Sequence, residues 1–252
     1  DAGIRDAIRD GVCQGPELLI SVVLLSQTGG HGDGFLPGVG LELPAGLITP
    51  PFPGRPTYLV DSPDAMRVAV RQVLRAGADW IKVATTGGVS APHDDPFAEE
   101  LGLDAVRVAV EEAAIRKRHV MAHAMGGVGL DLAVEAGVRS IEHGVFLSEA
   151  QAARMAERGT WLVPTLAVVH DVMGLARAGA LPDYAARKAL AIEPLIGEAV
   201  RIARAAGVRI ALGTDAFFAS AHGRNLREIA FMHEAGLTPA EALVAATATG
   251  AE

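Results

Sequence analysis

The chain has 252 residues, of which 50% are hydrophobic, and its formal net charge is −8 at pH 7. This length suits one large α/β domain or two small ones. The acidic balance argues against a nucleic-acid partner, because phosphates call for a basic surface. The single cysteine, Cys13, excludes an intrachain disulfide and is typical of a reducing compartment, so we expect a cytoplasmic protein. The longest apolar run, Leu18 to Leu25, is too short to span a bilayer, and no membrane partner is expected.

From the N-terminus onward, predicted helices alternate with predicted strands. Apolar residues at helical spacing predict helices over 4–12, 63–75, 103–118, 128–136, 148–158, 183–206, 224–235 and 239–248. Short apolar, β-branched runs predict strands over 18–26, 79–84, 119–123, 140–143, 161–165 and 209–215. Long loops are expected over 35–56 and 85–101, and another loop is expected after residue 165.

This alternation with short connections predicts right-handed βαβ units and a parallel sheet. We find no internal domain boundary and no repeat beyond the βα cadence. A closed (β/α)₈ TIM barrel needs eight strands, and the sequence predicts six. Either two strands are missing from the chain or the sheet is open.

One residue stands out inside a predicted strand. Lys82 lies in the apolar run Ile81–Ala84, where a charged ammonium is costly. A lysine there must find an anion, lose its proton or be chemically modified. The simpler alternative is that Lys82 forms an ion pair in the protein interior.

Three more polar residues mark the ends of later predicted strands: His123, His143 and Asp215. In a parallel barrel, the carboxyl ends of the strands share one rim, where active sites lie. Two neutral imidazoles and a carboxylate are ordinary ligands for Zn²⁺, which lowers the pKa of bound water towards about 7. Asp215 can take a proton from that water as a general base. A neutral Lys82 amine can react with CO₂ to form a carbamate that bridges two metal ions.

Each of the four residues also has a structural explanation when it is taken alone. A histidine at a strand end is more often a core or loop residue, and Asp215 can be a turn residue. Four ligand types on four strand ends of one rim together favour the metal site.

At these residues the chain resembles the amidohydrolase superfamily of metal-dependent hydrolases. The similarity is to the branch of imidazolonepropionase-like enzymes and Xaa-Pro or Xaa-Arg/Lys dipeptidases. The matching segments are 28–33 (TGGHGD), 81–88 (IKVATTGG), 120–124 (VMAHA), 140–144 (SIEHG), 163–166 (VPTL), 213–216 (GTDA) and 238–243 (TPAEAL).

The resemblance implies an amidohydrolase-type TIM barrel with a role for each marked residue. Lys82 would be the carboxylated lysine between two metal ions, and His123 and His143 would complete the more exposed metal site. Asp215 would bind the other metal and act as the catalytic base. The resemblance implies substrate-binding roles for His31, Thr86, Gly87 and His170.

The family pattern also places a His-x-His pair at the end of its first strand, and this sequence contains none. We therefore expect residues 1–252 to form one partial barrel domain, with about strands three to eight present. The first two strands and the small β-domain of the family would be absent. The segment Leu166–Asp171 also lacks the tyrosine that peptidase members often carry there.

The expected function is hydrolysis of an amide bond, in a peptide-like or N-acyl amino acid substrate, by a metal-activated hydroxide. The expected cofactors are one or two zinc or other divalent ions and a lysine carbamate made from CO₂. Two alternatives stay open: a cyclic amide or imidazolone hydrolase or deaminase, and a non-catalytic barrel that has lost one metal site. The resemblance also makes a homo-oligomer one of the expected assembly states.

Overall fold

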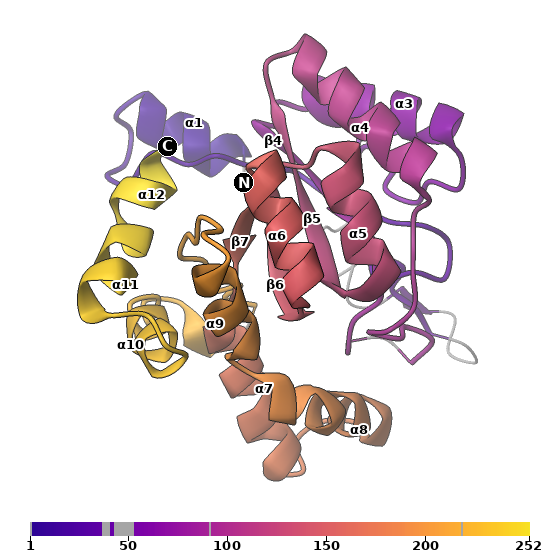
Figure 1. The fold of residues 1–252 in the computed structure, drawn as a ribbon. Helices are drawn as coiled ribbons and strands as arrows, with labels where there is room; N and C mark the ends of the chain where they lie inside the picture. The colour runs from indigo at the N-terminus through magenta and orange to yellow at the C-terminus, as the bar shows by residue number, and fades with distance from the viewer. Residues whose placement is uncertain (1, 37–40, 43–52, 91, 218) are drawn as a thin grey trace.

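The computed structural model describes residues 2–36, 41–42, 53–90, 92–217 and 219–252. At its centre is a five-stranded parallel sheet in the order β1-β4-β5-β6-β7 (Figure 1). Its strands are β1 (Leu24–Leu25), β4 (Trp80–Ala84), β5 (His119–Gly126), β6 (Ser140–Phe146) and β7 (Trp161–Val163).

Helices connect consecutive strands of this sheet. They are α3 (Pro63–Arg75), α4 (Leu103–Ile115), α5 (Gly127–Ala136) and α6 (Glu149–Arg158). Each strand therefore pairs with the one before it in the chain, which is the strand order of a (β/α)₈ barrel. The expected α/β class and the incomplete TIM barrel are confirmed.

The two faces of the sheet differ in chemistry. The face covered by the helices carries apolar residues that are fully buried, such as Ile81 and Ile141. The other face carries Lys82, Met121 and Ser140, which are paired across β4, β5 and β6. Side chains of paired residues project to the same side of a sheet, so this face holds the polar groups.

Helix ends follow the signals in the sequence. Ser62 caps α3 by accepting a hydrogen bond from the Ala65 amide, and Pro63 occupies the first turn. A capping box of Ser148 and Gln151 begins α6, and Gly159, at φ 69°, ends it. These local signals explain why the predicted helix boundaries lie close to the observed ones.

Five predicted elements differ from the structure. Strand 18–26 is reduced to β1, since Val22 has φ 65°, which no extended strand allows. The expected loop 35–56 contains an antiparallel pair, β2 (Phe35–Leu36) with β3 (Leu41–Glu42), while 37–40 and 43–52 lie outside the described residues. The expected loop after 165 is helix α7 (Leu166–Arg177).

The fourth difference is the predicted helix 183–206. It is divided into α8 (Asp183–Ile192), a 3₁₀ turn η1 (Glu193–Leu195) and α9 (Glu198–Ala205). Pro194 has no amide hydrogen for the helix, and Gly197 turns the chain at φ 83°.

The predicted strand 209–215 pairs at one point only. Ile210 bridges Leu162 of β7 in parallel, and beyond it the Leu212 amide donates to the carbonyl of Ala245. The chain then continues through η2 (Ala219–Ala221), α10 (Arg227–Glu234), α11 (Pro239–Ala246) and α12 (Ala248–Ala251), while α1 (Ala2–Arg9) precedes the sheet.

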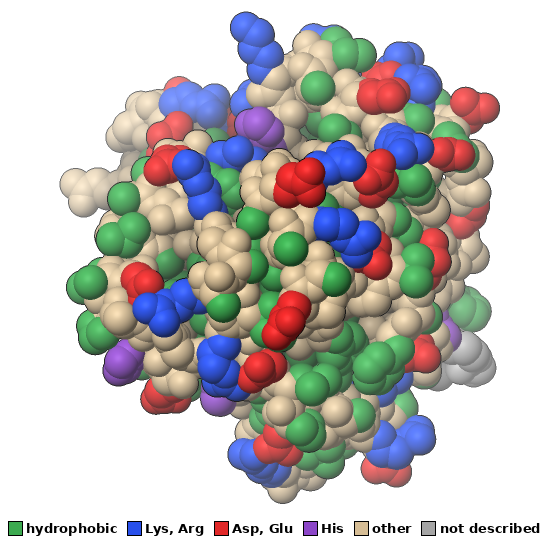
Figure 2. Space-filling view, in the orientation of Figure 1, with side chains coloured by type: hydrophobic (Ala, Val, Ile, Leu, Met, Phe, Trp, Pro, Cys, Tyr) green, Lys and Arg blue, Asp and Glu red, His purple; other side chains and the backbone are tan. Residues whose placement is uncertain are grey.

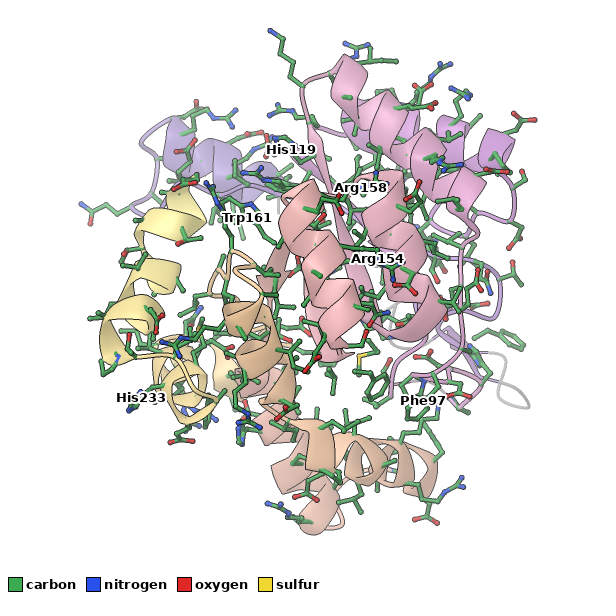
Figure 3. All side chains as sticks on the ribbon, viewed as in Figure 1. Phe97, His119, Arg154, Arg158, Trp161 and His233 are labelled. Carbon is green, nitrogen blue, oxygen red and sulfur yellow. The ribbon has the colours of Figure 1, made fainter. Side chains whose placement is uncertain are left out.

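Charged side chains of both signs are interspersed on the face drawn in Figure 2. Arg154 and Arg158 of α6, labelled in Figure 3, pair with Asp131 and Glu135 of α5. No helix among the described residues is long and apolar enough to cross a bilayer.

Candidate active site

Two histidines form the centre of the site, His123 within β5 and His143 within β6. Both strands continue to Gly126 and Phe146, so the predicted strand ends at 123 and 143 were too early. The ring centroids of His123 and His143 lie 4.6 Å apart, with the rings inclined by 66°. Burial is the main cause that lowers the pKa of each imidazole. Both rings are therefore neutral at pH 7, which is the form that binds a metal.

His143 reaches this position through an unusual backbone conformation. Alternation along β6 would send Glu142 and His143 to opposite faces, and Glu142 is the residue paired with His123. His143 instead has φ 77°, and the pairing of β5 with β6 shifts between Ala124 and Gly126. A left-handed conformation at a non-glycine residue is strained and is characteristic of functional sites.

One nitrogen of each ring is already hydrogen bonded. His123 Nε2 donates to the carbonyl of Gly87 at 3.0 Å, which leaves Nδ1 with its lone pair. His143 Nδ1 lies 2.6 Å from Thr165 Oγ1, which leaves Nε2. Metal-binding histidines are commonly oriented in this way through their second nitrogen.

Lys82 lies on β4, on the same face of the sheet as His123. It is half-buried rather than enclosed, and no described residue accepts a hydrogen bond from its ammonium. Glu142 lies on the same face of the sheet, where it is buried and receives a hydrogen bond from Ser140 Oγ at 2.6 Å. Burial raises the pKa of Glu142, and the charge of Lys82 acts in the opposite direction.

Sequence reasoning missed Glu142. The signal was present, because a carboxylate inside the strand Ser140–Phe146 is as unusual as a lysine inside β4. The sequence prediction selected His143, one residue further on, as the metal ligand of this strand.

Asp215 follows the segment that bridges β7 and has φ 46°. It is exposed, and its carboxylate opposes the burial effect on the pKa of His143. A cavity beside it is lined by Ala167, Val168, Asp171, Thr214, Asp215, Ala216, Phe217, Ala221, Arg224, Asn225 and Arg227.

The structure brings His31 to the same place from a distant loop. Its ring stacks on His123, and its Nδ1 lies 2.7 Å from Asp94 Oδ2. The His31 amide donates to Glu100 Oε1 at 2.7 Å. Gly88 is required beside it, because a Cβ atom there would come within 2.5 Å of the His31 ring.

The other expected substrate residues separate into two places. Gly87 accepts from His123, and Thr86 Oγ1 accepts from the Met125 amide, so both support the strand ends. His170 lies on α7 and stacks on Phe231 of α10, with ring centroids 4.0 Å apart. The substrate role of His170 stays a prediction.

The residue types at this site, two neutral histidines with a lysine and an aspartate, fit those that hold divalent metal ions in this kind of site. His123 Nδ1 and His143 Nε2 are free nitrogen donors, Lys82 lies on the neighbouring strand β4, and Asp215 follows the segment that bridges β7. Within the described residues, no group of three or more His, Cys, Asp or Glu side chains is arranged to hold a metal ion.

The chain has recognisable relatives among known proteins. The model of the amidohydrolase family matches residues 1–252. Ochratoxinase of Aspergillus niger is 37% identical over 251 residues, which are 97% of this chain and 51% of that protein. The chain spans about half the length of the curated relatives it matches.

Two solved structures are similar over the whole chain. A prolidase complexed with N-methylphosphonate-L-proline has a TM-score of 0.89 and 33% identity, covering 100% of this chain and 60% of that one. A Xaa-Pro dipeptidase with bound methionine in its active site has a TM-score of 0.87 and 32% identity, covering 99% and 60%.

Proposed function

Because the chain belongs to the amidohydrolase family, we propose that it hydrolyses amide bonds in small substrates that carry a free carboxylate. Dipeptides and N-acyl amino acids are the substrate classes. One or two divalent ions, with zinc as the first candidate, would be held by Lys82, His123, His143 and Asp215. The observation that carries this proposal is the pair of neutral imidazoles whose outer nitrogens are bonded to Gly87 and Thr165.

Lys82 enters the proposal as its carbamate. The Lys82 ammonium would first release a proton to water, and the neutral amine would then attack the carbon of CO₂. The N–C bond forms as one C–O π bond opens, and the nitrogen releases a second proton to water, so that a cationic side chain becomes an anionic oxygen donor. The absence of a hydrogen-bond acceptor for Lys82 among the described residues supports this modification. When bound, a divalent metal would polarise the amide carbonyl and lower the pKa of a water molecule.

Asp215 would move the proton. Its exposed carboxylate lies beside a cavity, and its charge raises the pKa of His143 against the effect of burial. It would accept a proton from the attacking water and return it to the departing amine nitrogen. His31, which covers one face of His123, would limit the space on that side and exclude water.

The cavity beside Asp215 supports a carboxylate-bearing substrate. Arg227 in its wall already pairs with Asp171 at 2.8 Å. Arg224, in the same wall, has no ion pair among the described residues. A guanidinium that faces a cavity without a partner can bind a carboxylate in a bidentate manner. The names of the prolidase and the Xaa-Pro dipeptidase fit substrates of this kind.

A substrate panel with metal analysis tests the proposal. The purified protein is assayed with Xaa-Pro and Xaa-Arg dipeptides, N-acyl amino acids, lactams and imidazolones, with metal content measured by mass spectrometry. We expect hydrolysis of the first two classes and loss of both metal and activity in Lys82→Ala. Full activity and retained metal in Lys82→Ala would contradict the role of Lys82. Activity on lactams or imidazolones alone would favour ring opening.

A further inference from the structure

We infer that Glu228 is a positioning residue. From α10 it holds the first turn of α7 so that the Thr165 hydroxyl orients the imidazole of His143. One part of this inference, the role of His143 as a metal ligand, rests on the proposed function. The arrangement of Glu228, Thr165 and His143 is independent of that function, because hydrogen bonds of these three residues define it.

Glu228 is completely buried, with 0% of its surface exposed. Its Oε1 accepts a hydrogen bond from the Leu166 amide at 2.8 Å, and its Oε2 accepts one from the Ala167 amide at 2.6 Å. Among the described residues no guanidinium pairs with Glu228, and that of the adjacent Arg227 is bonded to Asp171. A buried carboxylate is costly to keep, so these two amide contacts account for its presence.

These amides are the first two of α7, where the amide groups have no carbonyl partner within the helix. Thr165 occupies the N-cap position but makes no capping hydrogen bond with its side chain. A threonine at this position usually bonds to the amide two or three residues on. Here Glu228 supplies acceptors from another helix, and the Thr165 hydroxyl is released to contact His143 Nδ1 at 2.6 Å.

The backbone at Thr165 shows why an external clamp is needed. Its φ of 51° lies in the left-handed region, which is unfavourable for a β-branched residue. The two amides immediately after it are those bonded to Glu228. The carboxylate therefore holds the turn that aims the hydroxyl.

A purely structural role would make Glu228 one of several ties between α7 and α10. Phe231 provides the matched comparison, since it joins the same two helices by stacking on His170 without touching Thr165. If Glu228 only fastened α10 to α7, Glu228→Gln and Phe231→Leu would have the same effects.

The test reads the state of His143 directly in metal-free protein. The ¹⁵N chemical shifts of its ring report which nitrogen carries the proton, and zinc affinity is measured by competition with a chelator. We expect Glu228→Gln and Thr165→Val each to change the His143 shifts and to weaken zinc binding about 10–100-fold. The double variant should be no worse than the weaker-binding single one. Thr165→Ser should restore binding, and Phe231→Leu should change neither readout.

Unchanged His143 shifts in a folded Glu228→Gln protein would overturn the inference, as would additive losses in the double variant. If Glu228→Gln does not fold, Glu228→Asp carries the same comparison, because its shorter side chain cannot reach both amides. If the protein binds no metal and cleaves no amide but the shifts still respond to Glu228→Gln, the proposed function fails and the positioning role stands.

Discussion

The imidazole of His31 lies flat on the imidazole of His123, with ring centroids 3.8 Å apart and planes inclined by 13°. The two residues are 92 positions apart, and the loop that carries His31 is fastened to Glu100 and Asp94. This stack defines one wall of the candidate site. It also makes the loop 27–34 part of the site rather than a mere connection.

Replacing Gly88 by alanine should displace that wall. The new Cβ atom would come within 2.5 Å of the His31 ring, and His31 would have to leave His123. We expect kcat/KM to fall at least about 10-fold, because misplacement of a binding group by about 1 Å is costly. Gly102→Ala is the matched control, since nothing lies within 4 Å of its added Cβ. Equal activities of the two variants would argue against a role for the stack.

Asp215→Asn tests the proton-transfer role. The amide has the same shape and tolerates the φ of 46° at this position, so the fold should be unaffected to within about 0.5 kcal/mol. An amide cannot accept the proton of the attacking water, and we expect kcat to fall about 10²–10⁴-fold. Steady-state kinetics and thermal unfolding are measured on the same preparation. A variant with normal kcat would remove Asp215 from the mechanism.

Arg224→Ala tests the carboxylate subsite. We expect KM for dipeptides or N-acyl amino acids to rise about 10-fold with little change in kcat, because the lost contact is made equally in the ground state and the transition state. Substrates whose carboxylate is blocked as an amide should be cleaved equally by both proteins. An unchanged KM for the free acids would place the carboxylate elsewhere.

Glu100 should make stability depend on pH in the direction opposite to an ordinary carboxylate. Burial raises the pKa of Glu100 from 4.5 to about 7, and the charge of Asp94 adds to the effect. Between these two values the folded protein holds a proton that the unfolded chain has lost. The contribution is therefore fully present below about pH 4.5 and is lost as the pH rises through about 7, by at most about 3 kcal/mol.

Urea unfolding of wild type and Glu100→Gln at pH 5 and pH 8 measures this dependence. The glutamine keeps the contacts to His31 and Ser26 without titrating, so the variant should gain stability relative to wild type at pH 8. Glu99→Gln changes the neighbouring, exposed carboxylate and should follow wild type. The buried Glu228, whose pKa is also raised to about 7, titrates in both proteins and cancels in the comparison. A constant difference between pH 5 and pH 8 would contradict the prediction.

Much of the barrel could be predicted because its signals are local. Apolar periodicity, the capping residues Ser62 and Ser148, and the terminating Gly137 and Gly159 each act within one turn of their own helix. Helix α7 was missed because its N-terminus has no cap of its own. Its first amides are served by Glu228, which lies more than 60 positions away in the sequence.

By itself, the sequence determined the order of strands and helices, the unusual charge at Lys82 and the imidazole of His123 on β5. These features depend on spacing and on the cost of placing a charge in an apolar strand. Only the tertiary structure decided that His143 turns towards His123, that His31 stacks on His123, and that Glu142 is paired with His123 on the sheet face that carries Lys82. These three contacts require a left-handed backbone at His143 and the approach of loops that are distant in the sequence. Packing around the whole sheet stabilises this strained conformation, which the residues next to His143 in the sequence would not favour by themselves.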